Sequence, residues 1–469
     1  MKVESNNFIE LASIAIQNTE QQAAVRRGTR NGYLNRLAAF TQFGYEHGQH
    51  LRMQAAAAKR RALKSLPDLL EEAEARMTEN GITVLWAEDA AEARHHVQEI
   101  AARHHVKRIV KSKSMLTEEI ELNDVLQGAG LDVVETDLGE YIVQIGGEHP
   151  SHIVAPIIHK SKESIRDLMV EKLGMPFTDS SGEMVAFARQ RLRPIYLDAD
   201  MGISGGNFVV AETGTIGLVT NEGNGRLCTS APRVHVVLVG IEKVVESVED
   251  YALLTQVLPR AGTGQHMTVY TSMINGPRRP DDPDGPEAVY VVLVDNGRSA
   301  IYATKYAEVL TCVRCGACQN ACPVYRSTGG GAYGWVYGGP IGAVLTPLYV
   351  GLENAKPLPY ASSLCGACKQ VCPVDIDLPR MLLDLRCDME VRGYGSRVYG
   401  VGLWVWSFTQ RWPWSYRLAA WAARVGQRIM GRWHPGPIGA WAKYRDVPTF
   451  APKTFHQLWA EREEVMSRK

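Results

Sequence analysis

Short apolar runs alternate with segments of helical periodicity through the middle of the 469-residue chain. The runs predict strands at 81–86, 106–110, 131–134, 234–239 and 289–294. The sequence between them predicts helices, for example over 91–105 and 116–128. The last two runs are nearly continuous, which is typical of strands buried on both faces of a parallel sheet. We therefore expect residues 66–300 to form an open parallel α/β sheet of the doubly wound type, with ligand-binding loops at the strand ends.

The segments on either side have different patterns. Residues 1–65 are rich in alanine, lack proline and carry several basic residues, so they predict a helical arm. The arm is either a packing element with a solvated face or a docking surface for a partner. Residues 387–469 hold eight of the ten tryptophans, and 13 Lys and Arg stand against 6 Asp and Glu from residue 388 onward. This mixture of Trp and Arg is typical of a segment that binds a partner protein or an anionic membrane surface. The alternative is a small helical cap that packs its tryptophans on the cysteine-containing region.

Composition and charge narrow the class of protein. The chain is 45% hydrophobic and 22% charged, as in soluble globular proteins, and its length predicts two to four domains. A formal net charge of zero gives no support for nucleic-acid binding. The sequence contains neither an N-terminal apolar segment nor a run of about 18 apolar residues, so we expect a cytoplasmic protein. Clustered cysteines in that compartment are expected to be reduced metal ligands.

Residues 312–323 contain four cysteines with the spacing C-x2-C-x2-C-x3-C-P. This spacing is typical of bacterial ferredoxins, in which the first three thiolates bind one [4Fe–4S] cluster and the fourth binds another. Gly316 permits the tight turn between ligands, and Pro323 ends the loop so that Cys322 can point elsewhere. A second cysteine run follows at 365–373.

Crossing between the two runs predicts two iron–sulfur sites. The first [4Fe–4S] cluster is expected on Cys312, Cys315, Cys318 and Cys372, and the second on Cys322, Cys365 and Cys368. Ser362 stands where a leading cysteine of the second run would be expected. The second site therefore takes either a [3Fe–4S] cluster or a [4Fe–4S] cluster whose fourth ligand is Ser362, solvent or Cys387. Zinc is the alternative, but seven cysteines do not divide into two sites of four.

Polar stretches of the α/β segment are candidates for substrate chemistry. A glycine-rich loop over 201–206 would let backbone N–H groups approach an anion. Glu212, shortly after it, is a candidate base or nucleophile, or a carboxylate satisfied within a turn. Lys113, together with Lys111 and flanking serines, is a candidate for binding an anionic ligand, or a solvated lysine beside a capped helix. A proton-transfer set or ordinary loop histidines are the two interpretations of His149, His152 and His159.

The order of these motifs resembles a known family, the lactate-utilisation iron–sulfur proteins, and within it the B subunit (LutB). The resemblance is carried by both cysteine runs and by residues 112–123, 150–153, 207–216 and 450–455. It implies an α/β domain similar to ribose-phosphate isomerase and CoA-transferases, a helical two-cluster ferredoxin domain over 301–386 and a family-specific C-terminal domain. The family pattern also has three cysteines in the second run, so Ser362 is no departure from it.

The resemblance also implies a function. The chain is expected to be the iron–sulfur electron-transfer subunit of an assembly with A and C subunits that oxidises L-lactate to pyruvate and passes electrons to an acceptor. Such an oxidoreductase subunit would have no turnover on its own. Independently of the resemblance, the Trp- and Arg-rich composition of the C-terminal region is compatible with contact either with another subunit or with the inner face of the membrane. One alternative is a subunit of another 2-hydroxy-acid or quinone-linked dehydrogenase. The others are a transferase or isomerase that uses Glu212, with structural clusters, and a redox sensor.

Overall fold

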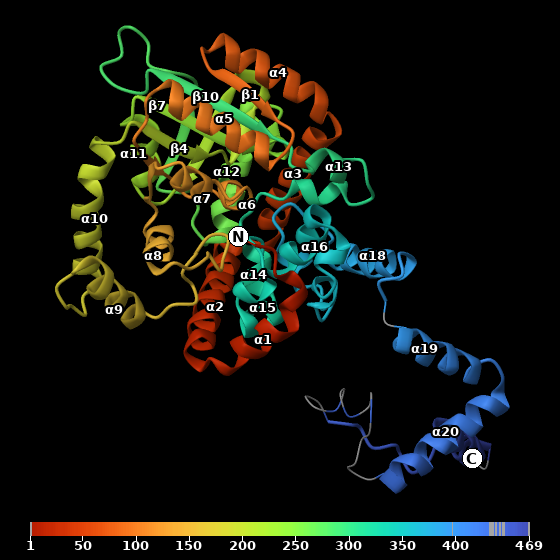
Figure 1. Ribbon diagram of the computed structural model, residues 1–469. Helices are drawn as coiled ribbons and strands as arrows, with labels where there is room; N and C mark the ends of the chain where they lie inside the picture. Colours follow the sequence, from red (N-terminus) through yellow and green to blue (C-terminus); the bar gives the residue numbers. More distant parts are fainter. Residues whose placement is uncertain are drawn as a thin grey trace. The chain divides into compact units, whose positions relative to one another are not determined.

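The computed structural model divides into two compact units, Met1–Val391 and Arg392–Lys469, and each is described by itself. The structure describes residues 2–395, 397–430, 436, 439, 442 and 446–467. Figure 1 shows the strands of the first unit, mostly in green, between helices α4 and α5 in orange.

A six-stranded sheet forms the centre of the first unit, with the strand order β1-β10-β7-β4-β2-β3 and parallel pairing throughout. Its strands are β1 (Thr83–Ala87), β2 (Arg108–Lys111), β3 (Asp132–Glu135), β4 (Met201–Gly205), β7 (Val234–Gly240) and β10 (Ala288–Val294). The expected open parallel α/β sheet is therefore confirmed. The predicted loop over 201–206 is wrong in part, because most of that stretch is β4. A Cβ at Gly202 would lie 1.8 Å from the Cys228 carbonyl oxygen, so glycine serves close packing there.

Helices bury both faces of this sheet, which explains the continuous apolar runs. One face packs against α5 (Ala90–Arg103), and the other packs against α4 (Leu66–Glu79). Along β10, Val292 belongs to the core on the α5 side and Val291 to the core on the α4 side. Because neighbouring residues of a strand point to opposite faces, every position of such a strand is apolar.

The single helix expected over 116–128 is two short helices, α6 (Met115–Glu119) and α7 (Leu122–Gly128). Glu121 between them has a left-handed backbone with φ of 53°. The break lets Leu116 and Leu122 enter the same buried core beneath α5. Burial of both side chains therefore outweighs the local preference for a continuous helix.

A second, four-stranded sheet with the order β8-β5-β6-β9 was not predicted. Its strands are β5 (Phe208–Val210), β6 (Thr215–Thr220), β8 (Val244–Val245) and β9 (Tyr270–Ile274). Two of them contain only two or three residues, too few to produce a recognisable alternation. Strands β5 and β6 form an antiparallel hairpin whose turn is the 3-10 helix η2 (Ala211–Thr213).

The remaining helices of the first unit complete the α/β segment, the arm and the cysteine-containing region. The arm consists of η1 (Ser5–Asn7), α1 (Phe8–Gln17), α2 (Thr19–Thr41) and α3 (Tyr45–Lys64). The α/β segment adds α8 (Leu138–Gly146), α9 (Lys162–Leu173), α10 (Ser181–Leu197), α11 (Asn224–Ser230), η3 (Ile241–Lys243), α12 (Val248–Gly262) and α13 (Arg298–Tyr302). The cysteine-containing region consists of η4 (Ala307–Thr311), α14 (Ala317–Ala321), α15 (Pro323–Thr328), η5 (Gly331–Tyr333), α16 (Gly339–Val350), η6 (Leu352–Asn354), η7 (Leu358–Tyr360), α17 (Ala367–Val371) and α18 (Leu378–Val391). Helix α2 of the arm packs against α14 and α15, beside which Figure 1 shows it.

The helices described in the second unit are α19 (Arg397–Thr409), α20 (Pro413–Met430) and α22 (Phe455–Ser467), and residues 446–454 before the last of them form neither helix nor strand. Its tryptophans at 404, 406, 414 and 421 are exposed within this unit. Trp433 and Trp441 of the predicted Trp-rich region lie outside the described residues. Across the part of the chain that the structure describes, we find no helix with the length and apolar content needed to cross a membrane.

Candidate functional site

Four cysteines from two distant parts of the chain line one small cavity, here called the first cysteine site: Cys312, Cys315, Cys318 and Cys372. The first three belong to a loop and to α14, and the fourth follows the end of α17. Gly316 has a φ of 74°, and a Cβ there would lie 2.9 Å from the ring of His152. The turn between the ligands therefore requires glycine.

The surroundings of the first cysteine site suit thiolate ligands. Backbone N–H groups of Arg314 and Ile376 donate to the sulfurs of Cys312 and Cys372, both at 3.4 Å. Burial, with repulsion from neighbouring thiolates, raises the pKa of Cys315 to about 12, so a bound cation is needed to keep such thiols ionised. Four convergent sulfur donors with backbone N–H support, in an apolar enclosure, fit a [4Fe–4S] cluster.

The second cysteine site consists of Cys322, Cys365 and Cys368. Cys322 and Cys368 are buried, whereas Cys365 is exposed. The three thiols interact electrostatically, and the backbone N–H of Tyr325 donates to the Cys322 sulfur at 3.5 Å. Within the described ranges, neither cysteine site nor any other group of three or more His, Cys, Asp or Glu side chains is arranged to hold a single metal ion, whereas the thiolates of an iron–sulfur cluster bind to several separate irons.

The two residues considered as a fourth ligand lie in different surroundings. Ser362 Oγ accepts the backbone N–H of Leu364 at 3.1 Å, in the loop that leads to Cys365. Cys387 is exposed on α18, and its electrostatic neighbours are Lys305 and Tyr306.

Two arginines of the arm reach the second cysteine run. Arg36 Nε donates to the Val371 carbonyl at 3.0 Å, and Arg52 Nε donates to the Cys372 carbonyl at 2.9 Å. Both arginines are buried, Arg36 to 7% and Arg52 to 8% residual exposure. The arm is thus a packing element whose basic residues are partly internal. Sequence reasoning missed this because a single arginine on a helix gives no periodic signal of burial.

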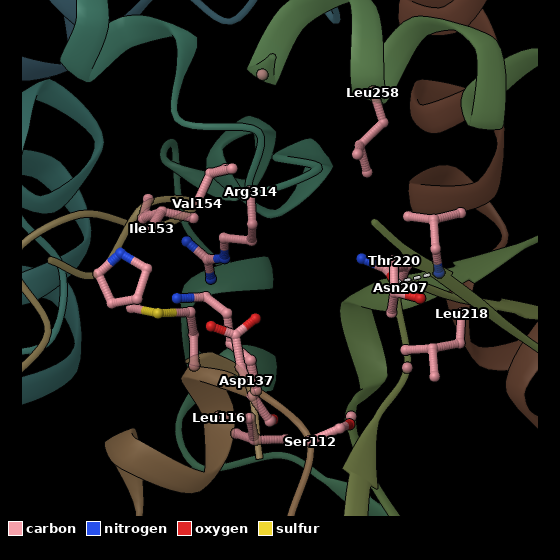
Figure 2. Close-up of a pocket in the computed structure, with 18 of the residues that line it drawn as sticks. Ser112, Leu116, Asp137, Ile153, Val154, Asn207, Leu218, Thr220, Leu258 and Arg314 are labelled. Atoms are coloured by element: carbon pink, nitrogen blue, oxygen red, sulfur yellow. Dashed lines mark hydrogen bonds between the residues drawn. The ribbon is translucent and has the colours of Figure 1, made fainter. Parts of the chain in front are cut away.

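A cavity of about 550 Å³ lies at the carboxyl ends of β2, β4 and β7, where open α/β sheets bind ligands. Figure 2 shows Ile153, Val154 and Arg314 on one side of it and Asn207, Leu218 and Thr220 on the other. Arg314 and Ile153 also line the first cysteine site. The cavity and the first cysteine site therefore share a wall.

A buried ionic network forms the part of the cavity wall nearest the first cysteine site. Arg298 donates to Glu119 at 2.9 and 3.0 Å and to Glu242 at 2.6 Å. The Tyr337 hydroxyl donates to Glu119 at 2.5 Å. Burial alone would raise the pKa of Glu242, but neighbouring cations, Arg298 foremost, lower it to about 2. Glu242 is therefore ionised, and its charge holds the cations of this wall in place.

Two lysines lie beside this network. Lys243 lines the cavity and donates to the Cys312 carbonyl at 3.5 Å, and burial lowers its pKa to about 8. Lys59, from the arm, donates to the carbonyls of Glu242 and Val244 at 2.9 and 3.2 Å. Burial and the charge of Lys243 lower the pKa of Lys59 to about 7. The arm, the α/β segment and the cysteine-containing region thus meet at one set of charges.

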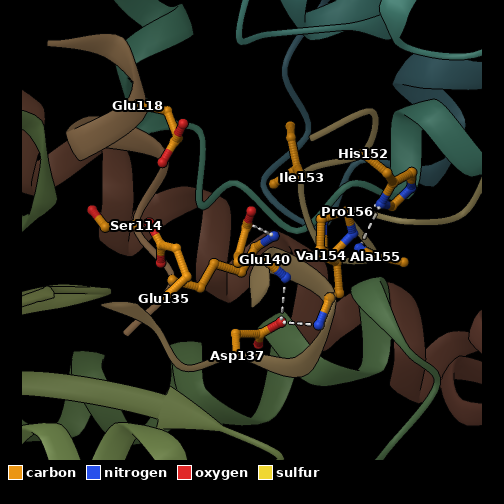
Figure 3. A network of polar contacts seen from close by, with 12 residues as sticks. Ser114, Glu118, Glu135, Asp137, Glu140, His152, Ile153, Val154, Ala155 and Pro156 are labelled. Carbon is orange, nitrogen blue, oxygen red and sulfur yellow. Dashed lines mark hydrogen bonds and ion pairs between the residues drawn. The ribbon is translucent and has the colours of Figure 1, made fainter. Parts of the chain in front are cut away.

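The predicted anion-binding lysines lie in two different places. Lys113 lines the cavity and pairs with Glu140 at 2.6 Å, near Asp137, which accepts the backbone N–H groups of Gly139 and Glu140 (Figure 3). Lys111 is fully buried and pairs with Glu135 at 2.5 Å. Of these two lysines, Lys113 is the one at the cavity.

Glu212 is not brought to the cavity. It lies in the η2 turn and accepts the backbone N–H of Val248, at the start of α12, at 3.0 Å. Gly214, two residues later, has a φ of 65°, and a Cβ there would lie 2.5 Å from the backbone nitrogen of Met77. The Glu-Thr-Gly-Thr motif is thus explained locally by a tight hairpin turn packed against α4.

The predicted histidine set is divided between two sets of contacts. His152 Nδ1 accepts the backbone N–H groups of Val154 and Ala155, both at 3.0 Å (Figure 3), and its Nε2 contacts Asn320 Oδ1 at 3.2 Å. His159 contacts Ser151 at 2.6 Å and Glu148 at 3.0 Å. His152 therefore positions the loop at the first cysteine site, next to Gly316.

A parallel α/β domain joined to a helical region with two cysteine sites defines an iron–sulfur protein. Family models agree: residues 70–294 match a LUD domain, 308–376 a 4Fe-4S dicluster domain, and 395–464 the C-terminal region of lactate utilisation protein B. The chain is 41% identical to lactate utilization protein B of Geobacillus thermodenitrificans, covering 99% of this chain and 98% of that protein. It is 40% identical to lactate utilization protein B of Bacillus subtilis, covering 99% and 98%.

Another relative is an uncharacterized electron transport protein, YkgF, of Escherichia coli, at 37% identity over 100% of this chain and 99% of that protein. Among solved structures, a DUF162 family protein from Deinococcus radiodurans matches 49% of this chain and 98% of its own, at 15% identity and a TM-score of 0.29. The chain belongs to the lactate utilisation protein B family, and the resemblance noted from its motifs is confirmed.

Proposed function

We propose that this chain carries electrons between two iron–sulfur clusters in an assembly that oxidises L-lactate to pyruvate. The observation that carries the proposal is the shared wall between the cavity and the first cysteine site, formed by Arg314 and Ile153. A ligand in the cavity would lie next to the first cluster. The names of the relatives support lactate as the substrate of the assembly.

Two [4Fe–4S] clusters are proposed. Cys312, Cys315, Cys318 and Cys372 would hold the first, and Cys322, Cys365 and Cys368 would hold the second. The fourth ligand of the second cluster would be Ser362 or solvent, because Ser362 lies in the Cys365 loop whereas Cys387 interacts with Lys305 and Tyr306. The clusters supply one-electron redox chemistry, and this chain supplies their burial, charge environment and spacing.

The partners would be the A and C subunits of the lactate-utilisation system and a separate electron acceptor, on the cytoplasmic side of the membrane.

The second unit is a candidate for peripheral membrane contact. Helix α20 exposes Trp414, Leu418 and Trp421 at helical spacing, and it also carries Arg417 and Arg424. Basic amphipathic helices of this kind bind anionic lipid surfaces. In vesicle flotation, a Trp414→Ala, Trp421→Ala double variant should lose binding to vesicles with 30% anionic lipid, and equal binding by both proteins would contradict this contact.

The test of the function uses the full chain reconstituted anaerobically with the A and C subunits. L-Lactate should reduce both clusters, and Cys368→Ala should lower dye-coupled lactate oxidation at least tenfold while the first cluster remains. Glu212→Gln should retain turnover within about twofold, because the Glu212 carboxylate caps α12 outside the cavity. Full turnover by the Cys368 variant would reject the relay. Loss of turnover in Glu212→Gln, with both clusters intact, would favour the transferase or isomerase alternative.

A further inference from the structure

The cavity at the end of the parallel sheet has the size and position of a ligand site. Its volume of about 550 Å³ falls within the range of small-molecule pockets. Its lining is mixed, with apolar side chains such as Leu116, Leu218 and Leu258 and a set of charged residues toward the cysteine-containing region (Figure 2). Apolar walls with a few fixed charges are typical of sites that orient a small polar molecule.

Arg314 is the charged residue in the wall between the cavity and the first cysteine site. Its side chain is only 10% exposed, and its guanidinium carbon lies 4.5 Å from the centre of the Tyr337 ring. Its nearest carboxylate oxygen belongs to Glu242, 3.6 Å from Nη2, and Nη1 has no hydrogen-bond partner among the described residues. A buried guanidinium with an unused donor is costly unless another group accepts from it.

Lys243 is similarly underused. It lines the cavity, its side chain is 13% exposed, and its nearest carboxylate oxygen, on Glu242, is 4.0 Å from Nζ. Its hydrogen bond to the Cys312 carbonyl oxygen is long, at 3.5 Å. An ammonium group has three donors, so Lys243 retains capacity for an anion.

The charges of this wall do not cancel. Glu119 and Glu242 are the carboxylates of this wall, and Arg298 forms short ion pairs with both of them. Arg314 and Lys243 share only the longer contacts to Glu242. Two carboxylates therefore face three cations, and the part of the wall that lines the cavity has a net positive charge.

We propose that this cavity binds the carboxylate of a 2-hydroxy or 2-oxo acid, with Arg314 and Lys243 as the anchoring cations. The choice of acid rests on the proposed function, whereas the carboxylate follows from the wall itself. Arginine recognises carboxylates through its fork of donors, and a neighbouring lysine adds a point charge. Because a three-carbon acid is much smaller than 550 Å³, charge rather than size selects the ligand.

The competing explanation is that Arg314 and Lys243 only balance the negative charge of a first cluster. Both explanations predict that replacing Arg314 changes the spectrum of the ligand-free protein. They differ in what a ligand does. A carboxylate bound in the cavity places a new charge beside Arg314, so its addition should change the EPR spectrum of the reduced first cluster in the wild-type protein.

The experiment measures binding to the isolated, cluster-loaded chain by anaerobic calorimetry, without the A and C subunits. The probes are L-lactate, pyruvate and L-lactamide, which has the shape of lactate but no charge. Lactate and pyruvate should bind at one site per chain, and lactamide at least tenfold more weakly. Arg314→Gln and Lys243→Gln should each weaken lactate binding at least tenfold, Arg314→Lys should lose less than Arg314→Gln, and the exposed Arg30→Gln should bind as the wild type does. Iron content and circular dichroism show that each variant is loaded and folded.

Equal binding of lactate and lactamide, or no binding of either acid to the loaded wild-type chain, would overturn the proposal. So would wild-type affinity in a folded Arg314→Gln variant, which would leave Arg314 with charge balance alone. If the acids bind but the complete assembly does not oxidise lactate, the site stands and the proposed function fails. If the assembly oxidises lactate while the isolated chain binds no acid, the function stands and the site is rejected.

Discussion

The two cysteine sites differ in how completely the chain encloses them. The first gathers four cysteines in an apolar cavity bounded by the α/β segment, with arm arginines on the adjoining carbonyls. The second has three cysteines, and one of them, Cys365, is exposed. A shielded site suits a permanent electron carrier, whereas an open one suits exchange with a partner or with solvent. The two sites of one ferredoxin-type region can thus differ in exposure, because the rest of the chain covers the first cysteine site more fully than the second.

Removing single cysteines tests this comparison with the largest expected effect. Cys372→Ala should remove about four irons per chain and lower stability, because Cys372 joins the two runs inside the enclosed site. Cys365→Ala should remove the second cluster and leave the first, because Cys365 lies at the open edge. Iron and sulfide analysis with EPR would measure both outcomes. If Cys365→Ala destroyed both signals, the two sites would not be separable.

Oxygen should attack the two sites at different rates. The second cluster should lose iron at least tenfold faster than the first under air, because its proposed ligand Cys365 is exposed, while Cys315 and Cys372 of the first cysteine site are buried. The expected first product is a [3Fe–4S] signal at the second site. Time-resolved EPR after exposure to air follows this, and equal decay of both clusters would contradict the difference in enclosure.

The arm should stabilise the enclosed site through its buried arginines. Arg36→Gln should lower the free energy of unfolding by about 1.5–3 kcal/mol, the range for hydrogen bonds from charged groups. Arg30→Gln, on the exposed face of the same helix, should change it by less than about 0.5 kcal/mol. Urea unfolding under anaerobic conditions compares the two variants. Equal effects would mean that the arm contributes nothing specific at Val371.

The buried His235 of the central sheet should make the free energy of unfolding depend on pH, independently of the cysteine sites. Burial lowers the pKa of His235, on β7, from 6.5 to about 4, so the folded protein keeps this ring neutral. The unfolded chain takes up a proton there below about pH 6.5, and stability is lost as the pH falls toward 4. Between pH 7.5 and 5.5 the wild type should lose roughly 1 kcal/mol more than His235→Gln. Urea unfolding at both pH values measures this, and identical losses would exclude His235 as the cause.

Cys387→Ala should have the smallest effect. Because Cys387 is exposed and interacts with Lys305 and Tyr306, the second cluster should keep its iron and its EPR signal in this variant. Loss of the second cluster would identify Cys387 as its fourth ligand and replace the Ser362 or solvent assignment.

The central sheet could be predicted because burial on both faces makes strands such as 234–239 and 289–294 continuously apolar. The two cysteine sites could be predicted because the geometry of iron–sulfur clusters fixes the spacing of their ligands along the chain. The charged wall between the cavity and the first cysteine site could not be predicted from the sequence. Glu119 and Arg298 are 179 positions apart, and an ion pair between distant residues leaves no periodic trace in the sequence. Glu212 was predicted as a candidate base or nucleophile because it follows a glycine-rich stretch, but close packing explains these glycines: Gly202 lies against the Cys228 carbonyl and Gly214 against α4.

The most direct test of the two-cluster account is iron and sulfide analysis of the anaerobically purified chain, with EPR of its reduced form. The account predicts about eight irons per chain and the signal of two interacting [4Fe–4S]+ centres. Zinc in place of iron, or a single cluster with about four irons in the intact wild-type chain, would contradict it.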